Sequence, residues 1–75
     1  MQARIRAVMA QIFNIDIDSI TEGSSPENIE RWDSLRHMQL ILAIEDEFGI
    51  TFPDDDIPEL LSPGAIENRV GQLAR

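Results

Sequence analysis

The chain is 75 residues long, and its fourteen acidic residues against six arginines, with no lysine, give a formal net charge of −8. This length predicts a single compact domain, residues 1–75, that is too small for a deep, walled active site. The charge excludes nucleic acid and anionic membrane surfaces as partners, because phosphate binding requires clustered positive charge, and the lack of cysteine excludes thiolate catalysis and most zinc sites.

The first predicted element is an amphipathic helix over residues 3–13, in which apolar residues recur at helical spacing. These apolar residues are Ile5, Val8, Met9, Ile12 and Phe13. A long linker follows, from Asn14 to Asp33, and linkers of this length in compact domains are often functional. We expect four isoleucines to anchor the linker to the core: Ile15, Ile17, Ile20 and Ile29.

The strongest predicted element is a helix over residues 34–48. It should end at Gly49, because glycine suits the left-handed conformation that follows a helix. An extended crossing then leads to a short acidic helix from Asp54 through about Leu61, which Pro58 makes irregular.

The last predicted helix begins at Ser62 and Pro63, a good N-cap and first helical residue. Its apolar stripe consists of Ile66, Val70 and Leu73. Together these elements predict an all-α fold, a small four-helix bundle with three longer helices and one short helix. No stretch approaches the roughly 20 apolar residues of a membrane span, so we expect a cytoplasmic protein without membrane insertion. No oligomeric contact is evident, and we expect a monomer.

The helix over residues 34–48 is more apolar than a small bundle requires, and at about 100° per residue it has two apolar stripes. The first stripe, which is core, consists of Leu40, Ile41, Ile44 and Phe48. The second stripe, rotated well away from the first, consists of Leu35, Met38 and Leu42. Either both stripes are core around a fully enclosed helix, or the second is an exposed contact surface, since apolar patches rimmed by charge often mark interaction sites.

The start of this helix carries the most specific motif in the chain. It reads Asp33-Ser34-Leu35, and the helix that follows ends in Ala43-Ile44-Glu45-Asp46-Glu47-Phe48-Gly49-Ile50. This motif and its helix resemble those of acyl carrier proteins. The resemblance covers nearly the whole chain in the order and length of its elements.

The resemblance implies that Ser34 carries 4′-phosphopantetheine through a phosphodiester, and that Asp33 helps a phosphopantetheinyl transferase to place magnesium and coenzyme A. A phosphate ester suits a helix N-terminus, where unpaired backbone N–H groups and the positive end of the helix dipole meet it. The thiol of the attached arm supplies thioester chemistry that a cysteine-free chain lacks. A carrier of this kind has no catalytic residue and no metal site, and it is not itself an enzyme.

The resemblance also implies a partner-facing surface on the second stripe. This surface consists of Leu35, Met38 and Leu42, with Glu30, Glu45, Asp46 and Glu47 as an acidic rim. The implied partners, besides the transferase, are an acyl- or aminoacyl-loading ligase and downstream synthase or transferase enzymes with basic surfaces. The cargo is an acyl or aminoacyl group of fatty-acid, polyketide or specialised metabolism.

Three residues depart from the family pattern. Arg36, His37 and Gln39 stand on a face where many members carry acidic residues, which argues against ordinary fatty-acid partners. Trp32, before the motif, is similar to the tryptophan of D-alanyl carrier proteins and of specialised stand-alone carriers. The Leu-Gly-Gly-x-Ser pattern of peptidyl carriers is missing. A D-alanyl or aminoacyl carrier is therefore an alternative.

The motif also allows other interpretations. An acidic helical interaction module that is never modified would explain the charge and the second stripe, but it leaves Asp33-Ser34-Leu35 as coincidence. Ser34 could also be an ordinary helix cap. A nucleophilic site built from Asp33, Ser34 and His37 is rejected, because nothing indicates an oxyanion hole or an enclosed pocket. We expect His37 to be solvated or to contact a partner.

Overall fold

A computed structural model describes residues 2–74 of the chain. Three α-helices form the body: α1 (Gln2–Phe13), α2 (Ser34–Phe48) and α3 (Pro63–Leu73). Two 3₁₀ helices lie between them, η1 (Ile17–Ser19) and η2 (Asp54–Glu59). Residues 2–74 contain no strand, so the predicted all-α fold with three longer helices and one short helix is confirmed. The short helix is η2, and η1 is a further single turn that the pattern did not predict.

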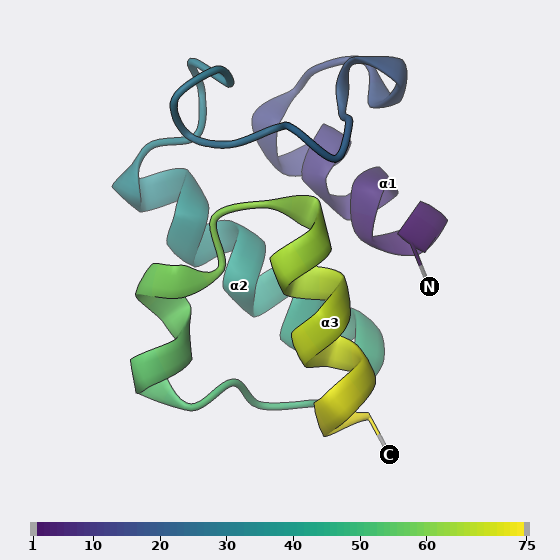
Figure 1. The fold of residues 1–75 in the computed structure, drawn as a ribbon, viewed down its shortest axis with the longest axis vertical. Coiled ribbons are helices and arrows are strands. Elements are labelled where there is room, and N and C mark those ends of the chain that lie inside the picture. Colours follow the sequence, from purple (N-terminus) through teal and green to yellow (C-terminus); the bar gives the residue numbers. More distant parts are fainter. Residues whose placement is uncertain (1, 75) are drawn as a thin grey trace.

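The helices pack around α1, which contacts both α2 and α3. In Figure 1 the yellow α3 crosses in front of the teal α2, and the blue linker passes over one end of the bundle before it enters α2. The green segment with η2 lies beside α2 at the left of the view. No helix of the described residues is long and apolar enough to cross a membrane.

The core is formed by the apolar stripes of all three α-helices. Its fully buried aliphatic and aromatic side chains are Ile5, Met9, Phe13, Leu40, Ile41, Ile44, Ile66 and Val70. Burial of each such side chain stabilises the fold by about 1.5–3 kcal/mol. The first stripe of α2 is thus core as predicted, except that Phe48 is only partly buried and lies under the guanidinium of Arg4, 4.6 Å from its ring centroid.

The linker between α1 and α2 is anchored by three of its four isoleucines. Ile20 and Ile29 are buried, and Ile15 is partly buried against the core. The prediction for Ile17 is wrong, because its side chain is 42% exposed. Ile17 begins η1 and lies at the surface beside the first turn of α1, while Ile20 leaves η1 in an extended conformation and fills the core position.

Polar side chains give the linker its shape in the absence of longer helices. The Ser24 hydroxyl is buried and accepts a hydrogen bond from the Thr21 N–H at 2.8 Å. The Asn28 side chain accepts from the Ser25 N–H at 2.9 Å and donates to the Gly23 carbonyl at 2.8 Å. These local bonds satisfy backbone groups that no regular element satisfies, and they hold the linker over the start of α2.

The first two α-helices end in the same way. Gly49, after α2, has φ 65°, and the next N–H, of Ile50, donates to the Glu45 carbonyl at 3.1 Å. Asn14, after α1, has φ 54°, and the next N–H, of Ile15, donates to the Ala10 carbonyl at 3.1 Å. A left-handed residue followed by this bond is a common helix end, so the predicted stop at Gly49 is confirmed.

Replacement of Gly49 by alanine is expected to lower the free energy of unfolding by about 1–2 kcal/mol. No atom lies within 4 Å of the place where a Cβ would be added, so the cost comes from the left-handed backbone alone. Urea denaturation followed by circular dichroism measures the change. Gly64→Ala is the matched control, since that site is equally open but has no positive φ, and it should be neutral or slightly stabilising. Equal effects of the two substitutions would contradict the argument.

Candidate functional site

The motif serine is the first residue of α2, and it is not the residue that caps the helix. Asp33 is the N-cap, because its Oδ1 accepts a hydrogen bond from the Arg36 N–H at 2.8 Å. Ser34 is exposed, and its hydroxyl lies outside this capping bond. The interpretation of Ser34 as an ordinary helix cap is therefore wrong, because Asp33 takes that role.

The backbone around Ser34 favours a negative charge. The first hydrogen bond of α2 runs from the His37 N–H to the Asp33 carbonyl at 2.8 Å, and the Arg36 N–H is taken by the Asp33 side chain. The N–H groups of Ser34 and Leu35 precede the first intrahelical bond, and such groups carry the positive end of the helix dipole. A phosphate on the Ser34 hydroxyl fits this position.

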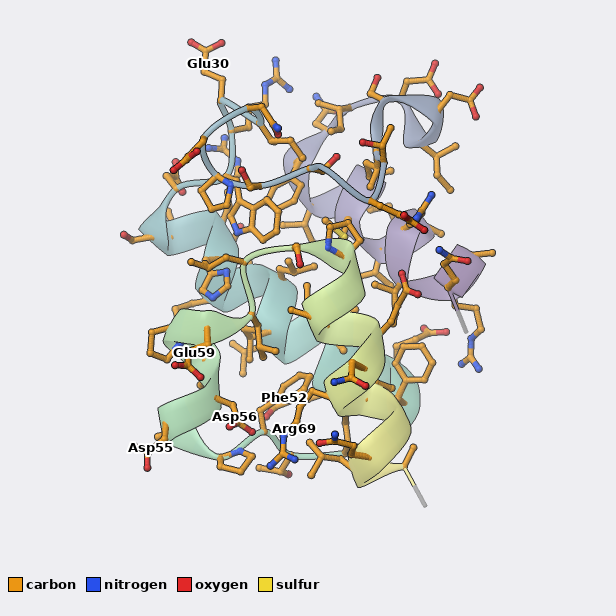
Figure 2. All side chains as sticks on the ribbon, viewed as in Figure 1. Glu30, Phe52, Asp55, Asp56, Glu59 and Arg69 are labelled. Carbon is orange, nitrogen blue, oxygen red and sulfur yellow. The ribbon has the colours of Figure 1, made fainter. Side chains whose placement is uncertain are left out.

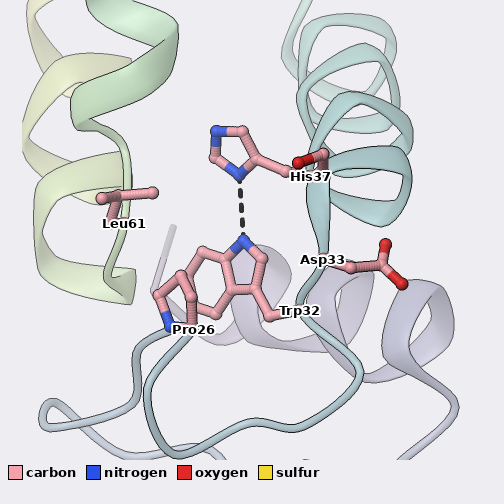
Figure 3. A pocket seen from close by; sticks show the side chains of 6 residues that line it. Pro26, Trp32, Asp33, His37 and Leu61 are labelled. Atoms are coloured by element: carbon pink, nitrogen blue, oxygen red, sulfur yellow. Dashed lines mark hydrogen bonds between the residues drawn. The ribbon is translucent and has the colours of Figure 1, made fainter.

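Asp33 and Arg36 form an ion pair beside the serine. The second carboxylate oxygen of Asp33 accepts from Nη1 of Arg36 at 3.0 Å. Arg36 therefore donates to both carboxylate oxygens, to one from its backbone N–H and to the other from its side chain. The two side chains are 53% and 40% exposed, and a pair this exposed contributes at most about 1 kcal/mol. The carboxylate points away from the cavity that lies on the other side of the helix start (Figure 3).

That cavity, of about 280 Å³, opens beside Ser34. It is lined by Pro26, Trp32, Asp33, Ser34, His37 and Leu61. The linker, the start of α2 and the segment after η2 thus meet around this cavity (Figure 3). Sequence reasoning did not place Pro26 or Leu61 at this site, because no local pattern indicates that these distant segments come together.

Trp32 is the rigid wall of the cavity. It is only 4% exposed, and its ring is tilted against Phe13 with 5.1 Å between ring centroids. Its indole N–H donates to Nδ1 of His37 at 2.9 Å, the bond drawn in Figure 3. The motif loop is therefore held both by core packing and by a hydrogen bond to α2.

His37 connects this loop to η2. Because the indole nitrogen of Trp32 can only donate, Nδ1 of His37 must accept, and the ring proton lies on Nε2. Nε2 is 2.8 Å from the Ile57 carbonyl and donates to it. The expectation of a freely solvated His37 is wrong, since the ring is half-buried and bonded on both sides. Contact of His37 with a partner stays a prediction.

The second stripe of α2 lies on the surface. Leu35, Met38 and Leu42 are 69%, 43% and 60% exposed. The alternative of a fully enclosed α2 is therefore wrong. The role of this stripe in partner contact stays a prediction.

The acidic residues around the stripe differ in their surroundings. One carboxylate oxygen of Glu45 accepts from the Phe52 N–H at 2.7 Å, and Glu47 forms an ion pair with Arg4 at 2.8 Å. Asp46 and Glu30 are exposed, and Glu30 extends outward from the linker, far from Asp55 and Glu59 of η2 (Figure 2). Three of the four predicted rim acids, Glu30, Asp46 and Glu47, are therefore exposed, and Glu47 and Glu45 also make structural bonds.

The acids of η2 are a second exposed negative group. Asp56 is the exception among them, because it pairs with Arg69 of α3 and so ties η2 to the bundle (Figure 2). Asp54, Asp55 and Glu59 are exposed. Residues 2–74 contain no group of three histidine or carboxylate side chains that could hold a metal ion.

Comparison with known proteins gives a family match and a similar curated relative. A protein-family model described as "Phosphopantetheine attachment site" matches residues 3–70. An acyl carrier protein of Lactobacillus acidophilus (strain ATCC 700396 / NCK56 / N2 / NCFM) is 38% identical over 61 residues, which are 81% of this chain and 76% of that protein. The family match includes the whole of α2 and both flanks of the cavity beside Ser34.

Proposed function

Since this chain belongs to the acyl carrier protein family, whose members carry 4′-phosphopantetheine and have no catalytic activity of their own, we propose that the group is attached to Ser34. The observation that supports this assignment is the position of the serine. It stands in the Asp33-Ser34-Leu35 motif as the first, exposed residue of α2, and its hydroxyl is not used in capping.

The chain's own residues prepare the serine for modification. In the transfer, Oγ of Ser34 attacks the pyrophosphate phosphorus of coenzyme A that bears the pantetheine arm. The bond from this phosphorus to the bridging oxygen breaks, adenosine 3′,5′-bisphosphate leaves, and the hydroxyl proton passes to a base of the transferase. The N–H groups at the start of α2 stabilise the negative charge of the resulting phosphodiester.

Asp33 has a second proposed role in this step. Its carboxylate is half exposed and lies next to Ser34, so it can help to position magnesium and coenzyme A on the transferase. Hard cations prefer carboxylate oxygens. Once attached, the group supplies a thiol that holds the cargo as a thioester.

Partner enzymes of the carrier include a phosphopantetheinyl transferase and synthase enzymes. The proposed contact surface is the exposed stripe of α2, Leu35, Met38 and Leu42. Glu30, Glu45 and Asp46 form its proposed acidic rim. The proposed cargo is an acyl or aminoacyl group, which a loading ligase attaches and a downstream enzyme of fatty-acid, polyketide or specialised metabolism accepts.

The assignment is tested by incubating the protein with coenzyme A, magnesium and a broad-specificity phosphopantetheinyl transferase, then recording the intact mass. We expect a gain of one phosphopantetheine in the natural sequence and none in Ser34→Ala. Ser34 is exposed, so the alanine variant should remain folded by circular dichroism. No gain in the natural sequence would favour an unmodified interaction module, and a gain that persists in Ser34→Ala would place the attachment elsewhere.

A further inference from the structure

Attachment at Ser34 creates a charge conflict with its neighbour. The phosphodiester carries one negative charge, and Asp33, the adjacent residue, has an exposed carboxylate. Two negative charges on adjacent residues repel each other, and the positive end of the helix dipole must then compensate both the phosphodiester and the carboxylate. A nearby cation would remove the conflict.

The cation in contact with this carboxylate is Arg36. Residues two apart on a helix normally point in different directions, so Arg36 would not be expected to reach Ser34 along the side of α2. Its side chain instead turns back to the helix start, where Nη1 lies 3.0 Å from Oδ2 of Asp33. The guanidinium is therefore placed beside the residue that directly precedes the attachment point.

From this placement we propose that Arg36 is a positioning residue for the phosphodiester, bridging it to the Asp33 carboxylate. The proposal rests on attachment at Ser34 and adds a role for a residue outside the motif. His37 cannot take this role, because both of its ring nitrogens are bonded, to Trp32 and to Ile57.

The guanidinium has the donors that a bridge requires. It presents five N–H groups in a rigid fork, a geometry that matches the paired oxygens of phosphates and carboxylates. Its contact with Asp33 uses Nη1. The Arg36 side chain is 40% exposed, so its other donors are accessible to a further acceptor beside Asp33.

Arg36 would act in two ways on the modified protein. It would offset one of the two adjacent negative charges, and it would fix the direction in which the arm leaves α2. A serine that carries a bridged phosphate has fewer allowed rotamers than a free one, so the arm would start from a defined orientation.

The test is a thermodynamic cycle between modification and the substitution Arg36→Gln. The melting temperatures of the unmodified and modified forms are measured for both sequences at low salt. Each sequence has a change in melting temperature on modification. This change should be less favourable for Arg36→Gln than for the natural sequence, by about 2–6 °C for a domain of this size. The difference should shrink in 1 M salt, because the charges are exposed.

Arg4→Gln is the matched control. Arg4 is also an exposed arginine with a carboxylate partner, Glu47, but this pair joins α1 to the far end of α2. Its replacement should change the melting temperatures of the unmodified and modified forms equally. Arg36→Lys should restore part of the effect, because lysine keeps the charge but loses the fork.

The ³¹P resonance of the modified protein gives a direct readout. It should shift between the natural sequence and Arg36→Gln, and it should stay unchanged in Arg4→Gln. If Arg36→Gln lowers both melting temperatures equally and leaves the resonance unchanged, the bridge does not exist although attachment stands. If the natural sequence gains no phosphopantetheine mass, the attachment at Ser34 fails and the bridge fails with it.

Discussion

Replacement of His37 by leucine is expected to lower the free energy of unfolding by about 2–4 kcal/mol. The substitution removes the acceptor of the Trp32 indole N–H and the donor to the Ile57 carbonyl. Leucine fills a similar space but leaves both polar groups unsatisfied, at about 1–3 kcal/mol for each that remains buried. Small domains have a total stability of only about 5–15 kcal/mol, so the loss is a large share of it.

Urea denaturation, followed by the fluorescence of the single tryptophan, measures this loss, because Trp32 itself reports on its surroundings. His37→Gln is the conservative control. Its amide oxygen can accept from the indole and its amide nitrogen can donate to Ile57, so it should cost less than leucine. If glutamine and leucine have equal effects, the two hydrogen bonds do not stabilise the fold and the ring acts by packing alone.

A double substitution separates the two bonds. Trp32→Phe removes the indole donor, so adding His37→Leu to it should cost less than His37→Leu costs alone. Circular dichroism measures all four unfolding free energies, because the Trp32→Phe variants contain no tryptophan. The loss of stability that His37→Leu still causes in the Trp32→Phe background then comes from the lost hydrogen bond to the Ile57 carbonyl in η2. Additive costs would show that Trp32 and His37 are not coupled.

The helix ends could be predicted because each depends on residues that are close in sequence. Gly49 adopts the left-handed conformation that ends α2, and Ser62 caps α3 by accepting from the Ala65 N–H at 3.1 Å. The motif serine was singled out because its tripeptide and the order of the surrounding elements resemble those of acyl carrier proteins. What local reasoning could not decide was that Asp33, rather than Ser34, takes the capping bond, since both residue types can cap a helix.

The surroundings of the site could not be predicted, because they depend on contacts between distant residues. His37 bonds to a carbonyl twenty positions away, in η2. Glu45 is predicted from its helix face as part of an acidic rim, and the structure adds a bond that the pattern does not indicate, from the Phe52 N–H beyond the end of α2 to its carboxylate. Periodicity places a side chain on a helix face, and it does not say which polar group of another segment lies opposite.

These ion pairs change the electrostatic picture of α2. Asp33 is paired with Arg36 at the start of the helix, and Glu47 is paired with Arg4 near its end, so a neighbouring arginine offsets each of these two acids. The exposed stripe is correspondingly the more distinctive feature of that helix. We therefore expect the apolar side chains to contribute more to partner affinity than the acids around them.

Replacement of Met38 by glutamate is expected to reduce the rate of phosphopantetheine transfer at least about fivefold, because loss of a hot-spot side chain near the centre of a contact surface costs more than about 1 kcal/mol of binding free energy. The measurement is kcat/KM for the natural sequence and the variant with the same transferase. Stability should change by no more than about 0.5 kcal/mol, since Met38 is 43% exposed. Leu42→Glu, at 60% exposure, should behave in the same way.

Ile17→Glu is the matched control for this prediction. Ile17 is 42% exposed, almost the same as Met38, but it lies on η1 beside the first turn of α1. Both substitutions exchange an exposed apolar side chain for the same negative charge, so only their position differs. If Ile17→Glu slows transfer as much as Met38→Glu, the effect is one of net charge and the stripe is not the docking surface. If Met38→Glu unfolds the protein instead, its side chain has a core role that its exposure does not indicate.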